Sequence, residues 1–134
     1  MNKDYPEQHW ISLILRVAMA SLFFVAALGK FLTGISASSG SIAGMFKNTF
    51  LPAWLVVPYA YLLPFAEALI AVWLLSGIKL RAAWIFTAFV LISLAFGMGV
   101  ARQNAADNYI YVVIACLGLY FSRYDCCGLS GNKE

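Results

Sequence analysis

The feature that most constrains this sequence is a single carboxylate, Glu67, inside a long apolar run that extends from residue 53 to residue 76. A run of that length can cross the hydrocarbon core of a bilayer as a helix. Two prolines, Pro58 and Pro64, precede Glu67 in the same run and predict kinks in that helix. Charged side chains are expensive at membrane depth and usually face a partner, a cavity or a proton pathway. What the chain does is therefore expected to depend on what Glu67 contacts.

The composition indicates an integral membrane protein. Hydrophobic residues make up 63% of the chain and charged residues only 11%, whereas soluble domains carry about 25% charged residues. Nine Lys and Arg residues against six Asp and Glu residues give a net charge of +3, and the cations are spread along the chain without a basic run. The lipid bilayer is therefore the expected partner, and nucleic acid is not.

Four apolar segments predict an all-α bundle of four transmembrane helices within a single domain, residues 1–134. The predicted spans are residues 11–32, 53–76, 82–100 and 105–121.

The connection between the first two spans is rich in Gly and Ser. Its last part, Met45 to Leu51, has the pattern of a short amphipathic helix at the membrane interface.

Four spans place both termini on the same side of the membrane. The cations on that side are Lys3, Lys79, Arg81, Arg123 and Lys133, and those on the other are Lys30, Lys47 and Arg102. The excess predicts that both termini are cytoplasmic, because cytoplasmic loops are enriched in Lys and Arg. The thiols of Cys126 and Cys127 then lie in a reducing compartment, and the sequence assigns them no role.

Arg16 is the first candidate partner for Glu67. Helical rise places Glu67 about 15 Å and Arg16 about 9 Å from the same membrane face, so long side chains could join them if the first two spans are neighbours. Three readings of Glu67 stay open: an ion pair that fixes helix register, a carboxylate that exchanges protons or binds a ligand, and the edge of a solvated cavity.

Several classes of enzyme lack the residues they need. His9 is the only histidine and lies in a polar segment, which argues against a haem held by two histidines. The cysteines show no C-x-x-C spacing, and neither a metal site nor a nucleotide-binding loop is indicated. A self-contained enzyme is therefore poorly supported, and no cofactor is expected within this chain itself.

The order of several short motifs resembles the DoxX/DoxD-like family of small membrane proteins. The motifs are Leu15-Arg16, Phe23-Phe24, Ala27-Leu28-Gly29-Lys30-Phe31, Phe50-Leu51-Pro52, Glu67, Leu74-Leu75-Ser76-Gly77, Arg81-Ala82-Ala83, Asn108-Tyr109 and Ser122-Arg123-Tyr124-Asp125.

The resemblance implies a four-helix bundle in the cytoplasmic (inner) membrane of a prokaryote. Relatives in that family include a membrane subunit associated with thiosulfate:quinone oxidoreductase and members that scaffold redox-defence partners. The resemblance carries Arg16, Lys30 and Glu67 over as functional positions, and Arg81 and Asn108 more weakly.

On this basis we expect a membrane subunit of a redox complex that docks a protein partner, or a second copy of itself. A quinone near Glu67 would use Glu67 for proton exchange, with Trp54, Tyr61 and Phe65 as candidates to surround its ring. Two alternatives are a purely structural anchor or assembly factor and a small proton-coupled transporter. Small four-span exporters typically carry their carboxylate in the first span, whereas Glu67 lies in the second. This difference argues against the transporter.

Overall fold

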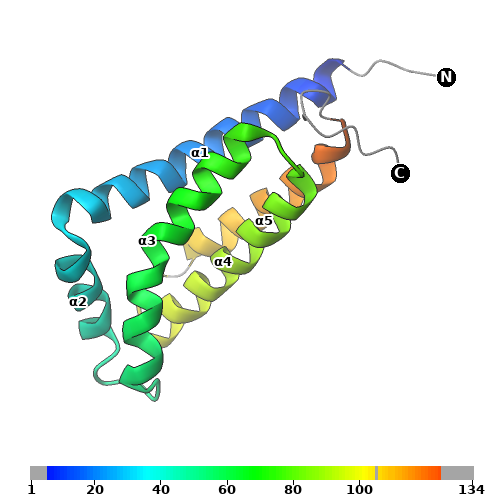
Figure 1. Cartoon of the computed structure of the whole chain (residues 1–134). Helices are drawn as coiled ribbons and strands as arrows, with labels where there is room; N and C mark the ends of the chain where they lie inside the picture. The colour runs from blue at the N-terminus through cyan, green and yellow to red at the C-terminus, as the bar shows by residue number, and fades with distance from the viewer. Residues whose placement is uncertain (1–5, 105, 125–134) are drawn as a thin grey trace.

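The computed structural model of the chain describes residues 6–104 and 106–124, and the regular elements within them are helices (Figure 1). These are α1 (Pro6–Thr33), α2 (Ile35–Met45), α3 (Ala53–Ser76), α4 (Leu80–Val100), α5 (Ala106–Phe121) and the 3-10 turn η1 (Ser122–Tyr124). The predicted all-α class is confirmed.

The four long helices form a ring of antiparallel neighbours. α1 packs mainly against α3 and α4 mainly against α5, while contacts of α3 with α4 and of α1 with α5 close the ring. The start of α1 and the end of α5 lie at the same end of the bundle (Figure 1). This end of the bundle is called the terminal end below.

Three of the described helices are long and apolar enough to cross a membrane: residues 7–33, 53–76 and 80–100. α5 is apolar but has only 16 residues, which corresponds to about 24 Å of helix. Large hydrophobic side chains are exposed on the outer surface, including Leu32 and Trp54, which are 79% and 76% exposed. Such a surface suits lipid rather than water, so the chain is a multi-pass membrane protein.

A tight connection makes α3 and α4 antiparallel. Gly77 ends α3 with a φ of 74°, a left-handed conformation that glycine adopts without steric cost. Lys79 precedes α4 with a φ of 46°. The Trp73 indole Nε1 donates a hydrogen bond to the Ile78 carbonyl, 2.7 Å away, and so fixes the turn.

The connection between α1 and α3 differs from the prediction. The Gly/Ser-rich stretch forms a helix, α2, whereas the interfacial helix predicted over Met45 to Leu51 is wrong because the residues after Met45 form turns. Gly and Ser are poor helix formers in isolation. α2 packs along α3 and buries Ser39, so tertiary contact outweighs the low propensity.

α3 continues as a helix through Pro58 and Pro64, and Figure 1 shows it bending partway along. Each proline removes one backbone donor and crowds the preceding turn, which accounts for a bend without a break.

Trp84 and Gly118 mark the closest approach of α4 and α5. Trp84 is fully buried in the core. A Cβ atom added at Gly118 would lie only 2.4 to 2.5 Å from three carbons of the Trp84 indole. The indole therefore occupies the space that a side chain at Gly118 would need.

We expect Gly118→Ala to destabilise the bundle by about 1–3 kcal/mol, because overpacking a rigid indole forces the helices apart. The measurement is the melting temperature in mild detergent. Gly99→Ala is the matched control, since a Cβ there meets no atom within 4 Å, and it should leave the melting temperature unchanged or raise it. Equal melting temperatures for both variants would contradict the packing argument.

Candidate functional site

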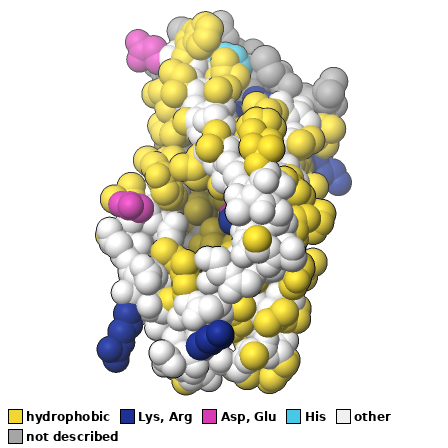
Figure 2. Space-filling model, turned by 90° about the vertical axis from the view of Figure 1, so that its left-hand side faces the viewer, with side chains coloured by type: hydrophobic (Ala, Val, Ile, Leu, Met, Phe, Trp, Pro, Cys, Tyr) yellow, Lys and Arg dark blue, Asp and Glu magenta, His cyan; other side chains and the backbone are white. Residues whose placement is uncertain are grey.

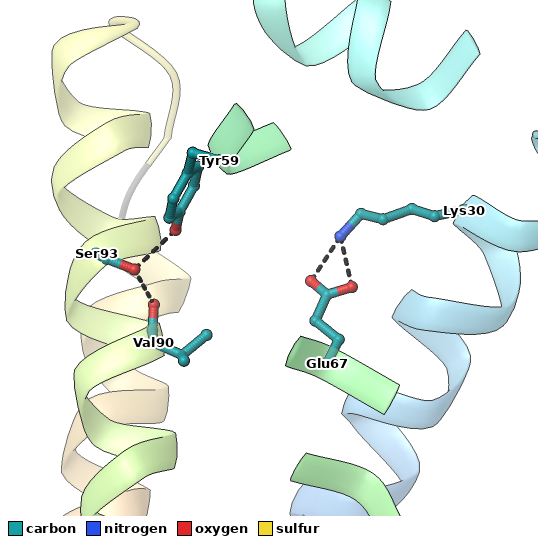
Figure 3. Close-up of polar contacts among 5 residues, drawn as sticks. All are labelled: Lys30, Tyr59, Glu67, Val90 and Ser93. Carbon is teal, nitrogen blue, oxygen red and sulfur yellow. Dashed lines mark hydrogen bonds and ion pairs between the residues drawn. The ribbon is translucent and has the colours of Figure 1, made fainter. Parts of the chain in front are cut away.

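The only acidic side chain of α3, Glu67, forms an ion pair with Lys30 of α1. The Lys30 Nζ atom lies 2.5 Å from Oε1 and 2.6 Å from Oε2 of Glu67 and donates to both oxygens (Figure 3). The Glu67 side chain is only 3% exposed, whereas that of Lys30 is 22% exposed. A buried carboxylate is thus neutralised by a lysine that can still be reached from the surface.

The direction of side chains on antiparallel helices explains this pairing. Every Cα–Cβ bond tilts toward the N-terminus of its own helix. Lys30 therefore extends back along α1 and Glu67 back along α3, so in an antiparallel pair the two side chains converge.

Arg16 does not pair with Glu67, which corrects the predicted Arg16–Glu67 contact. Its Nε atom donates to the Leu74 carbonyl at 3.0 Å and its Nη2 atom to the Leu75 carbonyl at 3.3 Å. The same tilt directs Arg16 away from Glu67 and toward the C-terminus of α3. There the guanidinium satisfies last-turn carbonyls at the negative end of the helix dipole.

A hydrogen bond between two hydroxyl groups links α3 to α4. The Tyr59 hydroxyl lies 2.7 Å from Ser93 Oγ, and the Ser93 hydroxyl also donates to the Val90 carbonyl at 2.7 Å (Figure 3). Sequence reasoning missed Tyr59 and Ser93, because single hydroxyls on apolar helices form no motif.

The molecular surface is hollowed on the side where α1 ends and α2 begins. Figure 2 views that side and shows a recess near the middle of the molecule, walled largely by hydrophobic side chains and with charged side chains at its edge.

The remaining predicted residues do not gather around Glu67. Arg81 begins α4 and Asn108 begins α5, and since these helices are antiparallel the two residues lie at opposite ends of the bundle. Trp54, Tyr61 and Phe65 are 76%, 44% and 53% exposed, so they face outward instead of enclosing a ring.

Phe65 faces outward but still has an aromatic neighbour. The ring of Phe65 does contact Phe31 edge-on, at 5.6 Å between centroids. Cys126 and Cys127 lie outside the described residues. Within the ranges 6–104 and 106–124, no three His, Cys, Asp or Glu side chains cluster as a metal site would require.

The fold and this pair define a class: a small helical membrane protein with an ion pair inside the bundle. The family model described as "Methylamine utilisation protein MauE" matches residues 8–110, which include Arg16, Lys30, Glu67, Arg81 and Asn108. The chain belongs to the MauE family. The DoxX/DoxD-like resemblance therefore identified the kind of small membrane protein but not the family that is shown. No curated protein and no solved structure matches the chain.

A double-mutant cycle tests how Lys30 and Glu67 depend on each other. Lys30→Met leaves a buried carboxylate without its cation, and losing one member of a buried pair costs about 3–5 kcal/mol. Glu67→Met should cost less, because the partly exposed lysine can extend to more polar surroundings. The double variant Lys30→Met/Glu67→Met should recover most of the melting temperature lost by Lys30→Met.

Lys47→Met is the control for this cycle, because it replaces an exposed lysine. Melting temperatures of the purified variants in one detergent give the comparison. Losses that simply add in the double variant would show that the two side chains are not energetically coupled.

Proposed function

We propose that this chain is an integral-membrane accessory subunit of a redox system in a prokaryotic cytoplasmic membrane, with Lys30–Glu67 as its functional site. The observation that carries the proposal is the buried Glu67 carboxylate paired with a more accessible lysine. An ion pair that only fixes helix register is the competing explanation, but ionisable side chains within transmembrane segments most often mark ligand or proton pathways. A charged pair at this depth is therefore better explained by a role than by stability.

Membership of the MauE family supports a role in a redox system at the membrane. The name of the family connects it with methylamine utilisation, and we carry over to this chain a place in such an oxidative system.

A quinone is the ligand that we propose for the Lys30–Glu67 pair. The Lys30 ammonium can donate a hydrogen bond to a quinone carbonyl oxygen, and Glu67 can exchange protons as the ring is reduced. Reduction to the quinol takes two electrons, which the partner supplies, and two protons, which Glu67 relays one at a time. The edge-on contact of Phe31 with Phe65 is a further contact between α1 and α3, the two helices that carry Lys30 and Glu67.

A structural anchor is the second candidate. Arg16 on the end of α3 and Lys30 on Glu67 both tie α1 to α3, which is what a clamp would require. On this reading Glu67 serves assembly and exchanges no proton.

Glu67→Gln separates the candidates, because the amide keeps the volume of the side chain and can still accept a hydrogen bond from Lys30. Membranes carrying the variant should retain the co-purifying partner but lose at least tenfold in methylamine-dependent quinone reduction, a typical size for a lost proton-transfer group. Glu7→Gln, at the exposed start of α1, should keep both. Pull-down in mild detergent and mass spectrometry of extracted lipids report the partner and the bound quinone.

Each remaining outcome contradicts part of the proposal. Loss of the partner in Glu67→Gln, with Glu7→Gln intact, would favour the anchor. Loss of proton-coupled flux in vesicles, with quinone reduction intact, would favour a transporter. A wild-type protein that purifies without either partner or quinone would overturn the redox role.

A further inference from the structure

A second cavity lies at the terminal end of the bundle, away from the Lys30–Glu67 pair. It has a volume of about 300 Å³ and opens between α4 and the end of α5. Six residues line it: Arg81, Ile85, Cys116, Leu119, Tyr120 and Arg123. None of the six is acidic, so within the described residues its lining carries two positive charges.

The antiparallel arrangement brings the two arginines together. Arg81 lies in the first turn of α4, and Arg123 lies in η1 directly after α5. The Arg123 guanidinium carbon stands 5.0 Å from the centre of the Tyr120 ring, a cation–π contact that holds the side chain at the cavity. The N-terminal end of α4 adds the positive end of a helix dipole to the same place.

The two guanidinium groups determine which ligand fits. Guanidinium groups present paired N–H donors that match the oxygens of a phosphate. Below them, Ile85, Cys116 and Leu119 supply an apolar floor on helices that face lipid. A free anion would use only the arginines, whereas a phospholipid would use both the cations and the floor.

We propose that this cavity binds a phosphate ester, and that its source is the headgroup of an anionic phospholipid in the cytoplasmic leaflet. Basic pockets between transmembrane helices on the cytoplasmic side are suited to such headgroups. The headgroup phosphate lies between Arg81 and Arg123, and its glycerol and acyl region lies along Ile85 and Leu119. This site does not depend on the proposed role of Glu67.

The first test is a titration with phosphatidylglycerol in mild detergent, followed by native mass spectrometry of the intact protein. The double variant Arg81→Gln/Arg123→Gln should weaken binding of the first lipid roughly 30-fold, since each cation near an anionic headgroup contributes roughly fivefold. Lys47→Gln/Arg102→Gln removes two exposed cations at the opposite end and should change binding less than twofold. Equal losses in both double variants, or none in the first, would overturn the proposal.

A second variant removes the space and keeps the charges. Cys116 is exposed at the cavity, so Cys116→Trp can fill part of it with little effect on the core. It should also weaken phosphatidylglycerol binding at least fivefold, and it carries the test if the double glutamine variant fails to fold. Unchanged binding in Cys116→Trp would overturn the cavity as the site.

Two other probes distinguish the sources of the phosphate. Phosphatidylcholine carries a compensating cation and should bind at least tenfold more weakly than phosphatidylglycerol; equal binding would overturn the anionic selectivity. Glycerol 1-phosphate lacks the acyl chains and should not displace the lipid at equal concentration. Displacement would overturn the lipid assignment in favour of a soluble phosphate ester.

Discussion

The rest of the structure depends on the register of α1 against α3. Helices in a bilayer gain little from apolar contact with one another, because lipid is as apolar as their side chains. Polar contacts therefore largely determine which register of the two helices is the most stable. Arg16 and Lys30 are 14 residues apart, close to four helical turns, so they lie on one face of α1. One holds the end of α3 and the other holds Glu67, and together they fix both the rotation and the translation of the pair.

The two proposed sites divide the molecule by depth. The Lys30–Glu67 pair lies within the bundle, with its carboxylate buried and its lysine partly exposed. The arginine cavity lies at the terminal end, where headgroups are found. On the proposed roles, lipid would position the chain at one depth in the membrane and the ion pair would act at another.

Much of the fold could be predicted because membrane helices are defined by apolar length, and Glu67 was conspicuous because charge is rare in such runs. Its partner was predicted wrongly because depth was reckoned from Cα positions, whereas side chains on antiparallel helices extend in opposite directions. α2 was missed because Gly and Ser indicate a loop unless a neighbouring helix stabilises them. The motifs predicted a small helical membrane protein but not the MauE family, because short apolar motifs are shared widely among small membrane proteins.

The length of α5 has a consequence for the membrane itself. Its 16 residues span about 24 Å, while a bilayer core is about 30 Å thick and α3, with 24 residues, spans about 36 Å. A short span is accommodated when the bilayer beside it becomes thinner, whereas a long span can tilt. We therefore expect the bilayer to be thinner beside α5 than beside α3. Such one-sided thinning costs fractions of a kcal/mol per Å. It gives neighbouring proteins with short spans a reason to gather at α5, and so gives this small bundle a preferred face in the plane of the membrane.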